Sequence, residues 1–278
     1  MRMRVWMLPL LAAAVIAGAA AAGHAVPSLG GPTGVVSVPT AAVAPTTDLQ
    51  ASVTYRALAI PETEPPADLK IWSIQALRGV SDEAELWAAY QRLHNTADSQ
   101  IWEFGGKIQM DQSLVKDSKM AVGVSLGRWM DGFGIPDVSP AVTDVDILKG
   151  YLVFSKDLTP GATPSWEWGP TPGIQAIGSA GILYLRASPD DDEDQTLCRP
   201  FAALEMAIGK GLNLGLEYRW QHSDLDEKAV FSAVVRRTIG EDLWMQLGTS
   251  NASPLGLGVE DQDIFIQVAY DIPMTTGY

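Results

Sequence analysis

Alternation of apolar and polar positions is the dominant pattern of this chain. From Leu212 to Gln221, leucine, tyrosine and tryptophan occupy every second position, and polar or small residues occupy the positions between them. Successive side chains of a β-strand point to opposite faces of the sheet, so the pattern predicts a strand with one apolar and one polar face. About 10 residues is enough to cross a bilayer as a tilted strand, and aromatic residues at the end of the apolar face are typical of a membrane interface.

The same alternation recurs along the chain and predicts a repetitive all-β architecture. Four further regular segments are 49–58, 99–110, 118–128 and 264–272. Seven less regular strands are expected at 69–78, 85–93, 145–156, 174–186, 200–209, 228–238 and 242–250. The total of about twelve is even, as a bacterial transmembrane barrel requires when both of its termini lie on one side. We therefore predict an antiparallel transmembrane β-barrel over residues 48–278.

The amino terminus has the pattern of a secretory signal. Arg2 and Arg4 precede an apolar run from Val5 to Ala22, and small residues follow it. These features predict a signal peptide over residues 1–25, cleaved at about residue 25, with a membrane-anchoring helix as the alternative. Residues 26–47 then form an N-terminal segment in front of the barrel. A secretory signal followed by amphipathic strands indicates the bacterial outer membrane.

The connections between the predicted strands differ at the two ends of the barrel. Short glycine-bearing turns are expected at 79–83, 209–211 and 239–241. Longer loops are expected at 61–68, 130–144, 189–197 and 251–262. Short periplasmic turns and longer outer loops are typical of outer-membrane barrels. The long segment 158–172 falls on the periplasmic side, where it plugs the lumen, folds beneath it or contains a further strand.

One predicted strand has a helix as its alternative. Ser81 could cap a helix in which Leu86, Tyr90 and Leu93 recur at helical spacing. The strand is favoured because its order of turn and strand repeats at 239–244, and repeated local patterns indicate repeated local structure.

Composition and charge narrow the possible partners. The whole chain has 19 Lys and Arg against 33 Asp and Glu, a formal net charge of −14, so nucleic acid is not an expected partner. A single cysteine, Cys198, excludes an intrachain disulfide and a cysteine-based zinc site. The expected partners are outer-membrane lipid and lipopolysaccharide, the barrel-insertion machinery and, in addition, polysaccharide.

Residues that could support catalysis are few. After the predicted cleavage only His94 and His222 remain, and His222 precedes Ser223 and Asp224. Adjacent residues of a strand point to opposite faces and cannot form the hydrogen-bonded relay of a catalytic triad. The acidic run 190–194 lacks the glycine and the spaced ligands of a calcium loop. We predict no enzyme activity, no cofactor and no metal site; an outer-membrane acyl hydrolase and a soluble periplasmic binding barrel are less favoured alternatives.

The inward face of the strands carries the candidate site. Its polar residues alternate with small ones such as Gly215 and Gly248, so the face can line a water path or close it by pairing across it. The predicted lumen-lining residues are Arg56, Glu103, Lys107, Glu205, Glu217, Arg219, Arg236, Gln246 and Gln267. Among them, Glu217 and Arg219 are expected to cluster with Glu205 and Arg236 from the adjacent strands. The sequence favours a narrow channel for small hydrophilic or sugar-derived solutes, with a non-transporting structural or assembly barrel as the alternative.

A resemblance to a known family begins just after the predicted signal peptide. Residues 27–41, with the sequence Pro-Ser-Leu-Gly-Gly-Pro-Thr-Gly-Val-Val-Ser-Val-Pro-Thr-Ala, precede the strand at Leu49. This arrangement resembles the first segment of YjbH-like outer-membrane barrels, which are associated with exopolysaccharide secretion. The hairpins around 85–87 and 214–218 are similar in style. The resemblance implies an outer-membrane barrel and supplies no catalytic residue.

Overall fold

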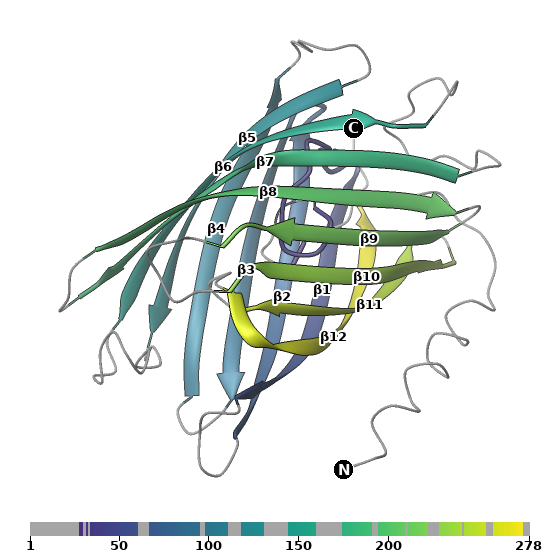
Figure 1. The fold of residues 1–278 in the computed structure, drawn as a ribbon. Helices are drawn as coiled ribbons and strands as arrows, with labels where there is room; N and C mark the ends of the chain where they lie inside the picture. Colours follow the sequence, from purple (N-terminus) through teal and green to yellow (C-terminus); the bar gives the residue numbers. More distant parts are fainter. Residues whose placement is uncertain are drawn as a thin grey trace.

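A closed barrel of twelve antiparallel strands makes up most of the structure, a computed structural model (Figure 1). It describes residues 28–29, 32, 34–60, 67–94, 98–110, 118–130, 144–159, 174–190, 194–208, 211–221, 228–240, 242–253 and 258–274. The strands are β1 (Asp48–Ile60), β2 (Ala67–Ser81), β3 (Ala84–His94), β4 (Asp98–Met110), β5 (Ser118–Met130), β6 (Val145–Asp157), β7 (Ile174–Pro189), β8 (Gln195–Ile208), β9 (Leu212–Arg219), β10 (Val230–Ile239), β11 (Leu243–Ala252) and β12 (Gly258–Pro273). Each strand pairs with its neighbours in the chain, and β1 pairs with β12 to close the ring.

The predicted fold class is confirmed, with corrections at some strand ends. Residues 84–94 form β3, so the helix alternative is wrong. The predicted loops at 189–197 and 251–262 are too long, because β8 begins at Gln195 and β12 at Gly258. Strand β9 ends at Arg219 rather than Gln221. No helix among the described residues is long and apolar enough to cross a membrane.

The barrel has two ends, which we name by its connections. The terminal end is where β1 begins and β12 finishes, and the loop end is opposite. At the terminal end, the turns after β8 and β10 each contain a glycine with a φ of 79°, Gly211 and Gly240. Residues with a side chain rarely adopt this conformation, so glycine permits these tight reversals. The predicted signal peptide and nearly all of the segment 158–172 lie outside the described residues.

The strands sort apolar residues outward and polar residues inward. Leu126 is 63% exposed and Phe104 60% exposed on the outer surface, whereas the inward positions are buried. Towards the loop end, outward aromatic side chains meet in pairs, with ring centroids 4.7 Å apart for Tyr55 and Trp72. A similar distance of 4.4 Å separates Tyr90 and Trp102. An apolar outer belt with an aromatic girdle is the surface that a barrel presents to lipid.

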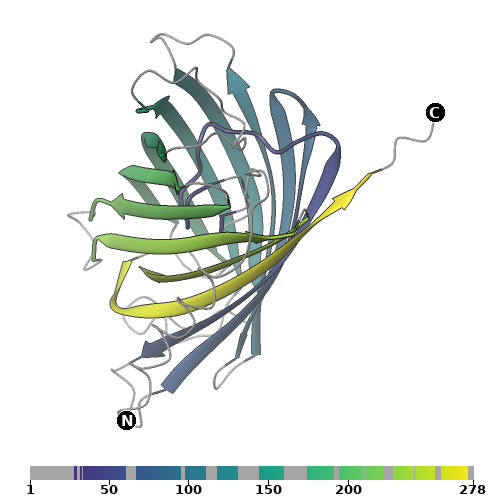
Figure 2. The same ribbon diagram turned by 90° about the vertical axis from the view of Figure 1, so that its right-hand side faces the viewer.

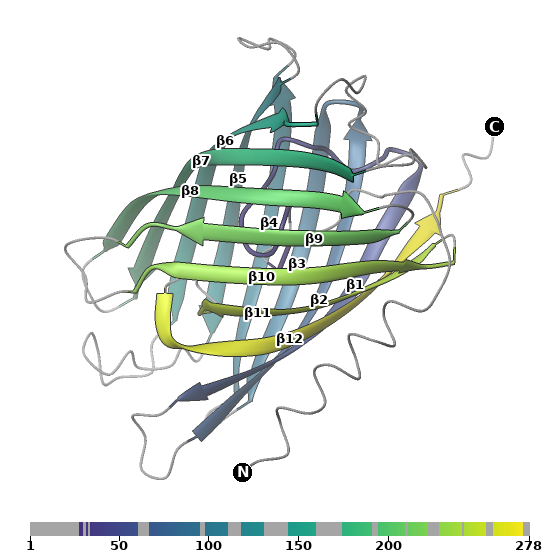
Figure 3. The same ribbon diagram turned by 45° about the vertical axis from the view of Figure 1, so that its right-hand side comes forward.

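The described residues of the N-terminal segment, 28–29, 32 and 34–47, lie inside the barrel. In Figures 1 and 3 its purple trace runs within the ring of strands, and Figure 2 shows it inside the ring from a third direction. The segment reverses direction between Gly34 and Pro39, which form an isolated antiparallel bridge. Its backbone joins the terminal end where the amide of Gly79 donates to the carbonyl of Pro45 at 3.2 Å. A plug formed by 158–172 was among the expectations from sequence, whereas occupation of the lumen by the N-terminal segment was not.

Apolar contacts fill the interior around the N-terminal segment. One cluster joins Val38, Ala41 and Ala44 to inward residues of the wall that include Trp87 and Phe201. A second cluster joins Leu29, Val35 and Val36 to Val234 and Phe265. A third lies near the loop end, on the inward face of β2 to β8, and consists of Ile71, Leu93, Ile101, Trp129, Ile147, Leu185 and Leu197. The interior is therefore partly apolar and partly polar.

Candidate functional site

All nine residues predicted to line the lumen lie in the barrel interior. Each is at most 7% exposed. The structure divides them among a network in the wall, two sets of contacts with the N-terminal segment and a cavity beside that segment. The division follows from register, because neighbouring strands bring their inward residues to different heights along the barrel.

The wall network connects β8 through β12 to β1. The Arg236 Nη1 lies 2.6 Å from the Glu205 Oε1, and the Arg236 Nε donates to Gln246 at 3.1 Å. Gln246 donates to Gln267, which donates to the Ser52 hydroxyl at 3.0 Å. Arg236 and Glu205 lie two strands apart and meet across β9, where Gly215 faces Glu205 without a side chain. Of the four residues expected to cluster, these two form a direct ion pair.

Glu217 contacts the N-terminal segment, whereas Glu205 contacts an arginine of the wall. Its Oε2 accepts hydrogen bonds from the backbone amides of Val36 at 3.2 Å, Ser37 at 2.7 Å and Val38 at 3.1 Å. Its Oε1 accepts from the hydroxyls of Ser37 and Ser232. Successive amides that converge on one oxygen form an anion-binding nest, and hydrogen bonds to a carboxylate are stronger than neutral ones. We call this set of contacts the Glu217 latch; Arg219 adjoins it by donating to the Ser37 hydroxyl at 2.9 Å.

A second set of contacts anchors the segment nearer the terminal end. Glu85 accepts from the amide of Ala44 at 2.8 Å and pairs with the Lys107 ammonium at 2.9 Å. Lys107 also donates to the carbonyl of Thr40 at 3.2 Å. Burial of an unpaired charge would be costly, and this arrangement pairs both charges while it satisfies backbone groups of the segment. Glu85 was absent from the predicted set, although its position on a predicted strand indicated the inward face.

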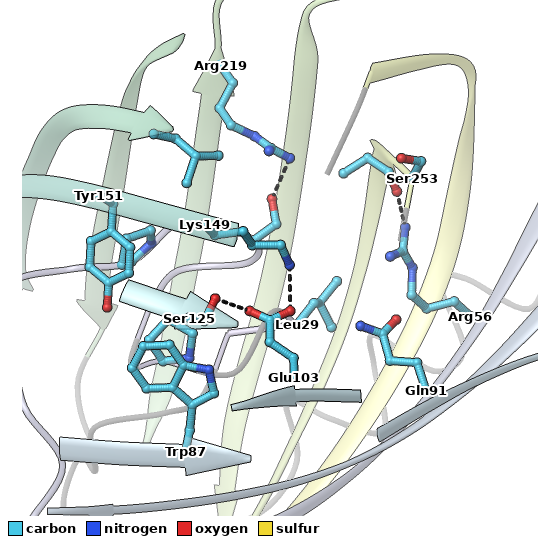
Figure 4. Close-up of a pocket in the computed structure, with 15 residues that line it drawn as sticks. Leu29, Arg56, Trp87, Gln91, Glu103, Ser125, Lys149, Tyr151, Arg219 and Ser253 are labelled. Atoms are coloured by element: carbon cyan, nitrogen blue, oxygen red, sulfur yellow. Dashed lines mark hydrogen bonds and ion pairs between the residues drawn. The ribbon is translucent and has the colours of Figure 1, made fainter. Parts of the chain in front are cut away.

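A cavity of about 60 Å³ lies between the N-terminal segment and the wall (Figure 4). Arg56, Glu103, Lys149 and Arg219 are the charged residues of the described lining. Glu103 accepts from the Ser125 hydroxyl and from the Lys149 ammonium, both at 2.6 Å. The Arg56 Nε donates to Asp263, outside the lining, at 2.7 Å. Lys149 lies on the predicted strand 145–156 but was not among the predicted lumen-lining residues.

Arginines pair with the acidic residues near the loop end. Arg128 contacts Asp144 at 3.0 Å, Asp146 at 2.9 Å and Asp190 at 3.2 Å; Asp144 is half-buried and the other residues are exposed. The hydrogen bond from Arg186 holds the pKa of Asp194 below its usual range. Within the described part of the chain, no group of three or more histidine, cysteine or acidic residues could hold a metal ion.

The residues considered for catalysis do not assemble into a described site. His94 is exposed at the loop end of β3. His222, Ser223 and Asp224 lie outside the described residues. The described interior presents hydrogen-bonding and charged groups.

Comparison with known proteins bears on the fold. No protein-family model matches the chain, and no curated protein matches it either. Among solved structures, the KdgM porin is similar over 79% of this chain and 98% of its own, with 10% identity and a TM-score of 0.50. The chain has the fold of an outer-membrane β-barrel. The COG4313 outer membrane channel from Pseudomonas putida F1 is similar over 84% of this chain and 98% of its own, with 11% identity and a TM-score of 0.50.

Proposed function

We propose that the protein is a narrow outer-membrane channel for small hydrophilic or sugar-derived solutes. The observation that carries the proposal is the charged cavity in the middle of the barrel, where Arg56, Lys149, Arg219 and Glu103 face an interior space. Burial of charges is costly, and an apolar filling would close a purely structural barrel at lower cost. Charged side chains along a pore are the usual means of passing and selecting hydrated solutes.

The solute class has support from one structural neighbour. KdgM has also been solved in complex with disordered oligogalacturonate, an acidic oligosaccharide. The resemblance of residues 27–41 to YjbH-like barrels points to sugar polymers as well and stays a prediction. We propose sugar-derived solutes as cargo and polysaccharide as a partner, in a protein that is inserted by the barrel-insertion machinery and has no catalytic role.

A non-transporting barrel is the second candidate, and a specific observation favours it. The N-terminal segment and the apolar cluster at the loop end together occupy much of the interior. A barrel filled in this way could serve as a structural or assembly element. Recording on the full-length protein distinguishes the two candidates, because only a channel passes solute while the segment is in place.

Planar-bilayer recording of the purified full-length protein tests the proposal. We expect reproducible small conductance steps, because the segment narrows the lumen without filling the central cavity. Proteoliposomes should also admit small neutral sugars and exclude large ones. Absence of current in the full-length protein and in a variant that lacks residues 28–45 would overturn the channel and leave the non-transporting barrel.

A further inference from the structure

The central cavity is rich in hydrogen-bond donors. Three cationic side chains, Arg56, Lys149 and Arg219, reach it from β1, β6 and β9. The one carboxylate in the described lining, Glu103, has both oxygens engaged by Ser125 and Lys149. The lining therefore carries more positive than negative charge, although the whole chain has a formal net charge of −14.

Two buried aromatic residues add further donors to the lining. Trp87 is 4% exposed and Tyr151 is 7% exposed, and both line the cavity. Among the described residues, the Trp87 indole nitrogen and the Tyr151 hydroxyl have no hydrogen-bond partner. Figure 4 shows both rings on the same side of the view. Both polar atoms are covered in this structure, so a ligand reaches them only when neighbouring groups shift; an acceptor placed there would then satisfy a donor whose burial is costly.

Glycines on adjacent strands fix the positions of both rings. A Cβ atom at Gly105 would lie 2.1 Å from the Trp87 ring, and one at Gly123 would lie 2.2 Å from the Tyr151 ring. Each ring therefore packs directly over backbone, where a larger residue would displace it. The two donors are held in place before a ligand arrives, and such preorganisation lowers the cost of binding.

We infer that this cavity is a binding site for the carboxylate group of a small solute. Carboxylate oxygens accept from ammonium, guanidinium, indole and hydroxyl donors, and charged donors strengthen these bonds. A volume of about 60 Å³ exceeds the roughly 10 to 15 Å³ that one water requires, so the cavity has room for a carboxylate group. The role of this site in transport rests on the proposed channel, which would favour anions at this level.

Ion selectivity is the first test, measured as the reversal potential of the full-length protein under a potassium chloride gradient. We expect anion preference in the wild type. Lys149→Gln should shift the reversal potential towards cation preference, because it removes a cation and uncovers Glu103. The double variant Glu103→Gln with Lys149→Gln should return the reversal potential most of the way to the wild-type value. Lys156→Gln makes the same change on the outward face of the same strand and should have no effect. Cation preference in the wild type overturns the site.

Binding is tested separately from conduction, through the midpoint of thermal unfolding of the detergent-solubilised protein. Acetate and glucuronate should raise the midpoint and glucose should not, since a ligand that binds the folded state stabilises it. Trp87→Phe should reduce the rise. Trp129→Phe is the matched control, because the Trp129 indole is also buried without a partner in the described chain but belongs to the loop-end cluster.

The outcomes of the two tests separate the site from the channel. A rise with acetate and glucuronate assigns the site to acidic sugars; a rise with acetate alone assigns it to free small carboxylates. Equal rises with acetate and with inorganic phosphate or chloride overturn carboxylate recognition, and no rise with acetate overturns the site. A rise in the unfolding midpoint with acetate but no current supports the binding site and overturns the channel. Current without anion preference leaves the channel and removes the site.

Discussion

Glu205 and Glu217 are inward carboxylates on adjacent strands, yet they stabilise different parts of the molecule. Both are buried, at 7% and 2% exposure. Glu205 pairs with Arg236 of the wall, whereas Glu217 accepts hydrogen bonds from three backbone amides of the N-terminal segment. The Glu205–Arg236 pair can form without the segment, whereas the bonds between Glu217 and the segment cannot. The interior polar groups therefore comprise a network that belongs to the barrel and a latch that holds a separable component.

Arg236 connects the two parts. It donates to the carbonyl of Val35 at 3.0 Å in addition to its contacts with Glu205 and Gln246. A change at Arg236 would therefore affect the barrel and the segment together. Changes at Glu205 and Glu217 separate the two effects, so they provide the sharper tests.

The largest effect on barrel stability is expected from Glu205→Leu. Loss of one partner of a buried ion pair typically costs about 3 to 5 kcal/mol, because the other charge remains buried. The double variant Glu205→Leu with Arg236→Met should recover part of the loss, since apolar replacement of both partners is often neutral, while the bonds from Arg236 to Gln246 and Val35 are lost. The free energy of unfolding in urea measures both. A double variant as unstable as the single one would show that the pair does not account for the effect.

The next largest effect is expected from arginine substitutions at two adjacent residues that face opposite sides of the barrel wall. Leu216 is 41% exposed on the outer surface, and arginine there should cost about 2 to 4 kcal/mol near the bilayer midplane. Gly215 faces inward, and a Cβ atom there would lie 2.7 Å from Val35 of the segment. Gly215→Arg should therefore displace the segment and leave the outer belt intact. Folding yield and limited proteolysis in lipid vesicles measure the two outcomes; greater tolerance at Leu216 would reverse the assigned faces.

Glu217→Gln should loosen the latch while the barrel persists. A hydrogen bond to a charged group contributes about 1.5 to 3 kcal/mol, so loss of the charge should speed amide exchange in residues 35–41 roughly 10- to 100-fold. Hydrogen exchange followed by mass spectrometry measures this protection. The strands of the wall network serve as the internal control. Equal acceleration in those strands would mean that Glu217 stabilises the barrel itself.

The smallest effect is expected at the exposed loop end. The pKa of Asp194 is lowered by Arg186, so this contact contributes above the pKa of the unfolded state and is lost as pH falls through the lower folded value. Arg186→Gln should raise the pKa of Asp194 towards its usual range. Titration by nuclear magnetic resonance measures this change, and segment protection should stay the same. A change in that protection would contradict the separation of the loop end from the latch.

Strand number and facing could be predicted from sequence because alternation is a local property. The alternation within each strand shows which of its residues face inward and which face outward, whatever the register with its neighbours. For this reason Glu205, Glu217 and Arg219 were assigned inward before any partner was known. Glu85 and Lys149 also lie on predicted strands and follow the same alternation, but they were not included among the predicted lumen-lining residues.

The placement of the N-terminal segment could not be predicted in the same way. The amide of Val36 and the carboxylate of Glu217 are separated by 181 positions in the chain. Glu217 binds three backbone amides and two hydroxyls, and every residue except proline has a backbone amide N–H, so no complementary charge in the sequence indicates the contact. The small and apolar residues of 34–44 gain their role only from the aromatic residues of the wall around them.

The central claim is that the N-terminal segment narrows an otherwise conducting barrel. The most direct measurement compares single-channel conductance of the full-length protein with that of a variant that lacks residues 28–45, after both show heat-resistant compact migration on a detergent gel. We predict a conductance increase on the order of tenfold in the variant, because twelve strands enclose a lumen between those of filled and open barrels. Equal conductance in two folded proteins, or no current in either, would contradict the account.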